Sequence, residues 1–531
     1  VVYYHDGSFP GVNTTALIVP GPSLKLSIVD NTKECDNCIG TWGGFPVFIY
    51  GLPNSDKAGD TAVTSFLHNS AGDSGGAVAM RQGNNAAVVL GVDVVGNKAE
   101  TESGGGIYLE TANQYASFAQ TNFARNEAEL LGGGLAIEVS HSGVQVSNCS
   151  FLSNSASSGG GLGISTLNRA ISLPTEYGVG VSQSEFSSNS AVEGGAIYSS
   201  TTNGLLVNNS NIWSNVANSS GGGCFLGSAS NVDVTNSVLS TNSAPTGGAV
   251  YVGARTRLIV KSCDIMDNVA SISGGGIFLD SVTEFIPLRT VRLTSNSAGH
   301  HGGGLFLLNT PAWTPFSPSS SDIFEVVLTG NNATWGSAVF FNASDAITQQ
   351  GGLTHMSVSS NHALSGGTIF WVAQRNRISA ALDISSSTNT WGENTAAYGE
   401  QIATQAVHFG GVSDKVSISS SPDLLAPFVF TVLDYYDQKV KQNASVVTTE
   451  VVDVNRDICA GNLPSFVNST GSLPVNSGVA NFSSVLARCN PGGSMVVQYS
   501  TPTQVFLTLN ARVSYAFEPC EAGDTYVQGT C

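Results

Sequence analysis

The stretch FSSNSAVEGGAIY at residues 186–198 contains the motif that decides the fold. Phe186 stands three positions before Asn189, small residues follow, and the pair Gly194-Gly195 precedes a short apolar segment. The pattern recurs along the chain, and most copies are 26 to 30 residues apart. This period is too short for a propeller blade and lacks a leucine-rich consensus, so it predicts an all-β fold, a right-handed parallel β-helix of about thirteen coils. The repeated asparagines are Asn31, Asn69, Asn97, Asn126, Asn154, Asn189, Asn215, Asn242, Asn268, Asn296, Asn331, Asn361 and Asn394.

Stacked coils place equivalent residues of successive repeats above one another, because parallel strands pair about 4.8 Å apart. We expect the repeated Asn to adopt a left-handed turn and to hydrogen-bond to the coils on both sides. The glycine pair permits a positive φ or a close backbone approach at a corner. The apolar residues before the Asn should form one buried column, comprising Phe66, Phe123, Phe151, Phe186, Leu239, Ile265, Leu293, Leu328 and Val358.

The composition agrees with an extended β fold and excludes several classes of protein. Only 11% of the 531 residues are charged, the net charge is −18, and 41% are hydrophobic, which is enough to form a core. The 20 Lys and Arg residues form no cluster, so the sequence offers no surface for nucleic acid or an anionic membrane. No apolar run reaches the roughly 18 residues that a membrane-spanning helix needs.

The pairing of FxxN with GGA followed by Ile, Leu or Val resembles the repeat of chlamydial polymorphic outer-membrane proteins, which also occurs in surface proteins of unicellular eukaryotes. The resemblance covers about residues 26–406 and implies a parallel β-helix with an adhesive or cell-surface role. It supplies no catalytic residues. The matching residues include Phe66, Asn69, Gly75–Val78, Phe186, Asn189 and Gly194–Ile197.

The chain divides into four predicted parts. Residues 1–25 form an N-terminal cap or extension, and residues 26–406 form the β-helix. Residues 407–517 lose the repeat and alternate like sandwich strands, and the segment 478–500 resembles a strand pair of immunoglobulin-like surface domains. Residues 518–531 resemble the start of a cysteine-rich module of the ephrin-receptor or GCC2/GCC3 kind, and we expect more chain beyond Cys531. The cap and the sandwich should cover the open ends of the β-helix.

The nine cysteines favour an oxidising, extracellular compartment. Cys35 with Cys38, Cys459 with Cys489, and Cys520 with Cys531 are the predicted disulfides. A zinc or redox role for Cys35-x-x-Cys38 would need a second ligand pair or a thioredoxin-like context, and the sequence has neither. Three cysteines take coil positions that are aliphatic in other repeats and should be buried thiols: Cys149, Cys224 and Cys263.

Nine sequons occur, about as many as chance would give in a chain so rich in Asn, Ser and Thr. Asn148 and Asn208 precede the inner column closely and could be occluded, whereas Asn218, Asn332 and Asn443 are better candidates in a eukaryotic secreted protein. The full set is Asn13, Asn148, Asn208, Asn218, Asn332, Asn342, Asn443, Asn468 and Asn481.

Three features resemble catalytic or metal sites but are better explained as structural elements. Gly72–Gly76 copies the nucleophile motif of chymotrypsin-like proteases, yet about seventy preceding residues cannot build that barrel, and the motif falls in register with the other Gly-Gly turns. His300-His301 should be solvated turn residues. A β-helix lyase or hydrolase needs acidic residues beside basic ones on adjacent coils. Asp264 and Asp267 are the nearest pair, and we find no basic partner for them.

A short strand follows the glycine pair of each repeat, and its first apolar residue should point into the core. The next residue should then point outward, because side chains alternate along a strand. From residue 198 on, this position is always aromatic, which predicts an exposed apolar stripe larger than a soluble monomer normally shows. Another subunit or a glycan could pack there, or a long insertion such as 309–324 could cover it. The third alternative is the opposite alternation, which would place these rings in the core. The predicted interface residues are Tyr198, Phe225, Tyr251, Phe278, Phe306, Phe340 and Phe370.

The sequence thus predicts a secreted, non-catalytic structural or adhesion protein of the cell surface, which could be a filament subunit. We expect no catalytic residues, cofactor or metal. Its partners should be other copies of itself, other extracellular proteins or glycans, with no nucleic acid and no membrane-spanning segment. The alternative is a carbohydrate-binding or carbohydrate-active β-helix protein.

Overall fold

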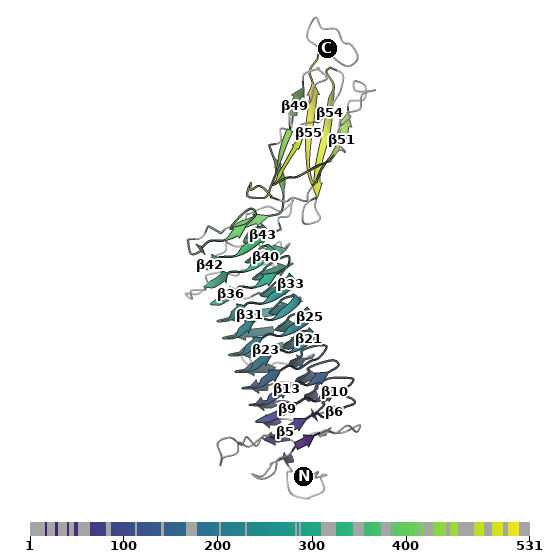
Figure 1. Cartoon of the computed structure of the whole chain (residues 1–531), viewed down its shortest axis with the longest axis vertical. Helices are drawn as coiled ribbons and strands as arrows, with labels where there is room; N and C mark the ends of the chain where they lie inside the picture. Colours follow the sequence, from purple (N-terminus) through teal and green to yellow (C-terminus); the bar gives the residue numbers. More distant parts are fainter. Residues whose placement is uncertain are drawn as a thin grey trace. The chain divides into compact units, whose positions relative to one another are not determined.

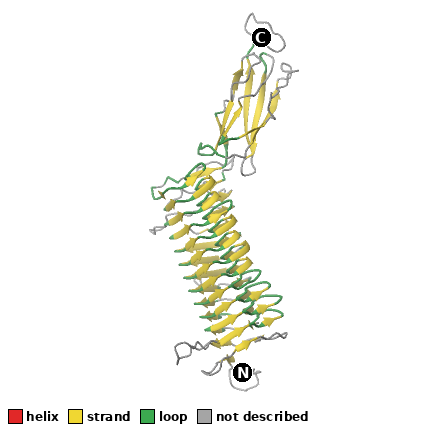
Figure 2. Cartoon of the chain, viewed as in Figure 1, coloured by secondary structure: helices red, strands yellow, loops and turns green. Residues whose placement is uncertain are grey.

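The computed structural model describes residues 16–18, 27–29, 40–41 and 47–50 and, with short gaps, 64–309. It further describes 325–342, 355–372, 384–411, 415–418, 428–441, 446–454, 472–482, 491–502 and 508–519, with one short gap. These residues form strands and turns, and no helix occurs among them (Figure 2). The chain divides into one unit of residues 1–362 and 382–394 and a second unit of residues 363–381 and 395–531.

The first unit is a parallel β-helix in which each turn contributes one strand to each of several sheets (Figure 1). Sheet A contains, in spatial order, β1 (Ala16–Ile18), β4 (Val47–Tyr50), β8 (Val88–Leu90), β12 (Ser117–Ala119), β16 (Val144–Ser147), β19 (Val179–Ser182), β23 (Asn203–Asn208), β27 (Asn231–Thr235), β31 (Arg257–Lys261) and β35 (Glu284–Phe285). Sheet B carries the strands with the inner column: β2 (Ser27–Val29), β5 (Thr64–Leu67), β9 (Val92–Val95), β13 (Asn122–Ala124), β17 (Ser150–Leu152), β20 (Glu185–Ser187), β24 (Asn211–Trp213), β28 (Val238–Ser240), β32 (Asp264–Met266), β36 (Val291–Thr294), β39 (Val326–Thr329), β42 (Met356–Ser359) and β45 (Thr390–Trp391).

Sheet C follows the glycine pair of each repeat. In the first unit it contains β3 (Gly40–Thr41), β7 (Val78–Met80), β11 (Ile107–Thr111), β15 (Leu135–Val139), β18 (Leu162–Ile164), β22 (Ile197–Ser199), β26 (Cys224–Leu226), β30 (Val250–Val252), β34 (Ile277–Asp280), β38 (Leu305–Leu308) and β41 (Val339–Asn342). Sheet D lies between B and C along the chain and is interrupted: β6 (Ser70–Ala71), β10 (Lys98–Ala99), β14 (Glu127–Ala128), then β21 (Ser190–Glu193), β25 (Val216–Ser220), β29 (Ser243–Thr246), β33 (Val269–Ser273), β37 (Ser297–Ala298) and β40 (Asn332–Trp335).

The predicted parallel β-helix is therefore confirmed, whereas the predicted number of coils is not. About nine turns are supported. Strand β1 pairs with β4, so the stacked strands begin inside the segment 1–25 that we expected to be an extension. Most of that segment lies outside the described residues, and its role as a cap stays a prediction.

The inner column is buried as predicted. Every one of its nine members has at most 1% of its surface exposed. Strand register places them directly above one another, for example Phe123 beside Phe151 and Phe151 beside Phe186. The rings of Phe123 and Phe151 stack at 4.7 Å, and those of Phe151 and Phe186 at 4.5 Å. The column is thus the apolar centre of the β-helix.

The repeated asparagines form a continuous hydrogen-bonded ladder beside this column. The Oδ1 atom of Asn215 accepts hydrogen bonds from the backbone N–H (2.9 Å) and the Nδ2 (2.9 Å) of Asn189 in the preceding turn. Its own Nδ2 donates to the carbonyl of Phe186 and to Oδ1 of Asn242 in the next turn, both at 3.0 Å. The same pattern runs from Asn69 to Asn394, so buried polar groups are satisfied by the stacking of turns.

One detail of the predicted turn is wrong. The asparagine does not adopt the left-handed conformation; the residue immediately before it does, as at Ser188 (φ 56°) and Ser214 (φ 54°). The positive φ at this preceding residue reverses the chain, and the following Asn can then aim both its backbone N–H and its amide along the stack. The predicted hydrogen bonds to the turns on both sides are confirmed.

The glycine pair has the two roles that we predicted, one for each glycine. Gly194 has a φ of +64°, a conformation that side chains rarely adopt. Gly195 needs no special φ, but a Cβ atom there would collide with the carbonyl oxygen of Gly222 in the next turn. The corner between sheets D and C therefore requires one glycine for its conformation and one for its close packing.

Replacing a ladder asparagine should be costly. Asn215→Ala removes the acceptor of the buried Asn189 N–H and the donor to the Phe186 carbonyl. Since each unsatisfied buried group costs about 1–3 kcal/mol, we expect the free energy of unfolding to fall by about 3–5 kcal/mol. Asn218→Ala, on the exposed side of β25, is the control and should change it by about 0.5 kcal/mol or less. Urea unfolding followed by circular dichroism measures both, and equal midpoints for the two variants would contradict the ladder.

Truncating the aromatic core should destabilise the β-helix to a similar degree. Phe186→Ala leaves a cavity beside the stacked ring of Phe151 in a site that is fully buried. We expect a loss of about 3–5 kcal/mol in the free energy of unfolding. Phe186→Leu should lose less, because it fills more of the cavity. A loss below about 1 kcal/mol for the alanine variant in a urea titration would show that the turns repack around the site.

The second unit contains two further sheets. One has the antiparallel order β48 (His408–Gly410), β50 (Phe428–Leu433) and β53 (Val479–Phe482). The other has the order β49 (Lys415–Ile418), β55 (Thr508–Phe517), β54 (Ser494–Pro502), β51 (Val446–Val454) and β52 (Ser472–Pro474), in which only the β49–β55 pair is parallel. The rings of Phe430 and Tyr499 join the two sheets at 4.4 Å. Immunoglobulin-like topology stays a prediction for this region.

The second unit also contains its own turn of parallel strands, and a polar loop covers it. Strand β44 (Ile369–Trp371) pairs with β47 (Ile402–Thr404). The buried carboxylate of Asp434 accepts a hydrogen bond from the backbone N–H of Thr404 (3.1 Å), and Nε2 of Gln438 donates to the carbonyl of Ile402 (2.9 Å). These contacts satisfy backbone groups at the edge of β47, which would otherwise be open to pairing with another chain.

Candidate interaction surface on sheet C

The aromatic residues of sheet C point away from the core, as predicted. Tyr251 is half-buried, whereas Val250 and Val252 on either side have 3% and 0% of their surface exposed. Register places each aromatic residue beside the next, for example Phe225 beside Tyr251 and Tyr251 beside Phe278. We call this set the aromatic column; within the first unit it comprises Tyr198, Phe225, Tyr251, Phe278, Phe306 and Phe340.

The rings of the aromatic column stack face to face along the β-helix. Successive ring centroids from Tyr198 to Phe340 are 5.1, 5.0, 5.3, 4.6 and 5.3 Å apart, with interplanar angles of 8° to 22°. The strand spacing imposes this geometry, and each such pair adds about 0.5–1.5 kcal/mol beyond burial. Because neighbouring rings occupy the faces, a partner can contact only ring edges and phenol groups. A glycan stacked on the faces of these rings, as we had considered, does not fit.

The prediction that the whole column is exposed is wrong for four of its seven residues. Tyr198, Phe225 and Tyr251 are half-buried. Phe278, Phe306 and Phe340 have 8%, 5% and 4% of their surface exposed, and Phe370, in the second unit, has 1%. The insertion 309–324 that we considered as a cover lies outside the described residues.

The residue that precedes each glycine pair explains part of this difference. At the buried end of the column this residue is large: the ring of His301 lies 4.5 Å from that of Phe340 and 6.0 Å from that of Phe306, and it stacks on Trp335 at 5.3 Å. In the repeats of Phe225 and Tyr251 the equivalent residues are Ser220 and Thr246, whose hydroxyl groups bond to each other at 2.8 Å. The small side chains leave the edges of the neighbouring rings accessible.

The prediction that His300 and His301 are both solvated is therefore only half right. His300 is exposed, whereas His301 is packed among three aromatic rings and its Nδ1 lies 3.2 Å from the hydroxyl of Ser273. Burial, with a smaller contribution from His300, lowers the pKa of His301 to about 4. The imidazole is thus neutral at physiological pH and behaves as one more ring of the stack.

This lowered pKa predicts a specific loss of stability in acid. The unfolded chain binds a proton on His301 below about pH 6.5, whereas the folded chain resists it until about pH 4. The stabilisation is complete above pH 6.5 and decreases as the pH falls toward 4. The melting temperature of the wild type should therefore fall relative to that of His301→Phe as the pH drops from 7 to 4. A constant difference in melting temperature across that range would show that His301 does not titrate with folding.

Charge substitutions should separate the buried end of the column from its open end. Phe306→Lys places an ammonium group among buried rings and should lower the free energy of unfolding by about 3 kcal/mol or more. Tyr198→Lys should lower the free energy of unfolding by only about 1 kcal/mol, because the lysine side chain can extend from this half-buried position into solvent. Differential scanning calorimetry measures both variants. A similar loss in both would mean that the whole column is core.

Carboxylates beside the aromatic column form a feature that the sequence analysis missed. The hydroxyl of Tyr251 donates to Asp280 at 3.3 Å, and that of Tyr108 donates to Glu138 at 2.7 Å. Burial and then the charge of Asp280 raise the pKa of Tyr251 to about 12, and burial raises the pKa of Glu193 above its usual range. The signal was present, since Asp280 directly follows the apolar strand residues 277–279.

The protease-like motif lies in a glycine corner, as predicted. The hydroxyl of Ser74 donates to the carboxylate of Glu102 in the next turn at 2.8 Å, and the residue is 5% exposed. Gly75 has the positive φ of the other corner glycines, and its N–H donates to the carbonyl of Ser103. Ser74 therefore takes part in a turn-to-turn hydrogen bond of the corner.

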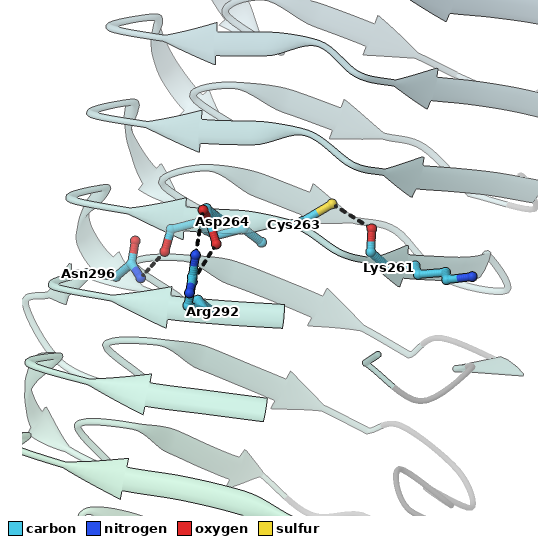
Figure 3. Close-up of polar contacts among 6 residues, drawn as sticks. Lys261, Cys263, Asp264, Arg292 and Asn296 are labelled. Atoms are coloured by element: carbon cyan, nitrogen blue, oxygen red, sulfur yellow. Dashed lines mark hydrogen bonds and ion pairs between the residues drawn. The ribbon is translucent and has the colours of Figure 1, made fainter. Parts of the chain in front are cut away.

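The statement that Asp264 has no basic partner is wrong. Arg292 lies directly beside it in the next turn, and its Nε donates to the Asp264 carboxylate at 2.8 Å (Figure 3). The signal was present in the sequence, because Asp264 and Arg292 both stand four residues before the repeated Asn of their turn, Asn268 and Asn296. Arg292 remains largely exposed, and the pair is a surface contact between stacked strands.

The three cysteines expected to be buried thiols are confirmed as such. Cys149, Cys224 and Cys263 are unpaired and at most 3% exposed, and burial raises the pKa of Cys149 and Cys263 to about 11 and that of Cys224 to about 12. Neutral thiols of this kind are poor nucleophiles. The predicted disulfide cysteines lie outside the described residues, and their pairing stays a prediction: Cys35, Cys38, Cys459, Cys489, Cys520 and Cys531.

The described sequons differ in exposure. Asn148, Asn218, Asn332 and Asn481 are exposed, so the expected occlusion of Asn148 is wrong, whereas Asn208 and Asn342 are half-buried. Asn148 escapes because it lies at a tight turn with a φ of 50°. Asn13, Asn443 and Asn468 lie outside the described residues. Glycosylation of any of them stays a prediction.

One comparison identifies a related family. Residues 183–200, the segment that contains Phe186, Asn189 and the Gly194-Gly195 corner, match the Chlamydia polymorphic membrane protein repeat. This short match fits a surface or adhesin-type β-helix protein. No curated protein matches the chain.

The described residues include no helix that could span a membrane. Within the same residues, no group of three or more His, Cys, Asp or Glu side chains could hold a metal ion.

Proposed function

We propose that this chain is a non-catalytic structural or adhesion protein of the cell surface, secreted into an extracellular environment. The observation that carries the proposal is the repeat at residues 183–200, which matches a repeat of membrane surface proteins and builds the turns of a continuous β-helix. The other turns use the same residues for the same contacts. A stack of this kind provides a rigid scaffold that presents surface side chains at regular intervals.

The open end of the aromatic column is the proposed contact surface for other proteins. Tyr198, Phe225 and Tyr251 offer ring edges and phenol groups at intervals of about 5 Å, and Asp280 adds a carboxylate. Aromatic residues that are partly exposed and held rigidly lose little entropy on binding, which is why they are enriched in interfaces. The partners would be other copies of the chain, as in a filament, or other extracellular proteins.

Location is the first test of this proposal. Antibodies raised against the purified chain should label intact cells of the source organism without permeabilisation, and brief protease treatment of intact cells should remove the signal. A known intracellular protein serves as the control for membrane integrity. Labelling that appears only after permeabilisation would rule out a surface role.

The alternative is a carbohydrate-active β-helix enzyme, and the pair Asp264–Arg292 is the observation in its favour. A uronate lyase needs a basic side chain to bind the carboxylate and a group to move a proton. Here the Arg292 guanidinium is already engaged by Asp264 through both Nε and Nη2, which disfavours that role. Incubation with polygalacturonate should release neither unsaturated products nor new reducing ends. Release that is abolished by Asp264→Asn would establish the enzyme instead.

A further inference from the structure

Trp213 is an exposed aromatic residue on sheet B, on a different sheet from the aromatic column. It lies at the end of β24, and 39% of its surface is exposed. Its neighbour in the preceding turn is Ser187 and its neighbour in the following turn is Ser240. The indole therefore has only small side chains on both sides of it along the stack.

A hydrogen bond fixes the position of the indole. Its Nε1 donates to Oε1 of Glu185 in the preceding turn at 2.8 Å, which draws the ring over the strand that carries both Glu185 and Ser187. Ser187 faces outward, next to the inward-facing Phe186, yet it is only 3% exposed. Ser187 lies between Leu152 and Trp213 in the strand register, so we infer that Leu152 and one face of the indole cover it and that the opposite ring face is open to solvent.

This arrangement is the reverse of that in the aromatic column. There each ring face is covered by the next ring, whereas no ring contact involves Trp213 among the described residues. An indole that has one accessible face and is held in place by a hydrogen bond loses little entropy when it binds a ligand. The open face carries the negative part of the ring quadrupole and attracts C–H groups with partial positive charge.

The surroundings of Trp213 favour a neutral ligand rich in hydroxyl groups. In the strands paired around it, β17, β20, β24 and β28, Glu185 is the only charged residue, and one of its oxygens already accepts the indole N–H. The exposed amide of Asn211 and the second carboxylate oxygen of Glu185 lie on the same outward face. These groups can donate to and accept from the hydroxyl groups of a ligand that rests on the indole.

We propose that Trp213, with Glu185 and Asn211, is a binding platform for the pyranose ring of a neutral glycan. One face of a pyranose carries axial C–H groups, which pack on the indole, while its equatorial hydroxyl groups reach the amide and the carboxylate. The platform adds a ligand to the proposed surface role but does not depend on it, because binding is measured with the purified chain.

Affinity electrophoresis with the full chain tests this platform. Native gels contain one of four soluble neutral polysaccharides: hydroxyethyl cellulose, laminarin, galactomannan or glycol chitin. We expect at least one polymer to retard the wild type. Trp213→Ala should weaken that binding about tenfold, and Trp213→Phe, which keeps an aromatic face, should weaken it less.

Controls separate the platform from a general effect on the sheet. Val269→Ala is the matched variant, because Val269 is an apolar residue of sheet D that is 47% exposed and lies outside the platform, so this variant should bind as the wild type does. Thermal unfolding of each variant verifies that the fold is intact, and the phenylalanine variant keeps the test valid if the alanine variant unfolds. The proposal is overturned if none of the four polymers retards the wild type, if Trp213→Ala binds normally, or if the chain binds poly-arginine through Trp213 and no polysaccharide.

Discussion

The side-chain amide of the repeated asparagine is the interaction on which the β-helix depends. At the corner after each strand of sheet B, a backbone N–H and a carbonyl lose their strand partners and are buried beside the aliphatic and aromatic core. The amide of one asparagine satisfies both, and it also hydrogen-bonds to the asparagines of the turns on either side. An amide has a donor and an acceptor that point in different directions, so it can link a stack without end. Aspartate has no donor, and leucine has neither.

The stack then imposes its spacing on every other side chain. Parallel strands about 4.8 Å apart place equivalent residues in contact, so phenylalanines stack inside the helix and tyrosines and phenylalanines stack outside it. Small residues recur at the corners for the same reason, because a Cβ atom on Gly195 would collide with the carbonyl oxygen of Gly222 in the next turn. In the second unit, backbone groups at the edge of β47 are hydrogen-bonded by side chains instead, by Asp434 and Gln438 from a separate loop.

Stacking also decides which aromatic faces are available for binding. The rings of the aromatic column use their faces on each other, which leaves edges for a partner. Trp213 lies between Ser187 and Ser240 and donates a hydrogen bond to Glu185, and we infer that one face of its indole is open to solvent. The contacts that we propose for the two surfaces differ accordingly, a protein packed against ring edges and a glycan stacked on a ring, although both surfaces arise from outward positions of parallel strands.

The sequence by itself determined the parallel β-helix, the buried column from Phe66 to Val358, the roles of the glycine pair and the burial of Cys149, Cys224 and Cys263. Each of these follows from a local repeat, because stacking makes every turn face a near copy of itself. The contact between Arg292 and Asp264 was also within reach of the sequence, because both residues stand four positions before the Asn of their repeat. The sequence could not determine exposure, because Phe306 and Phe225 occupy the same position in their repeats, yet Phe306 is buried beside the large His301 and Phe225 is half-buried beside the small Ser220. Tertiary structure decided these points, since burial depends on the size of side chains that the repeat leaves free to vary.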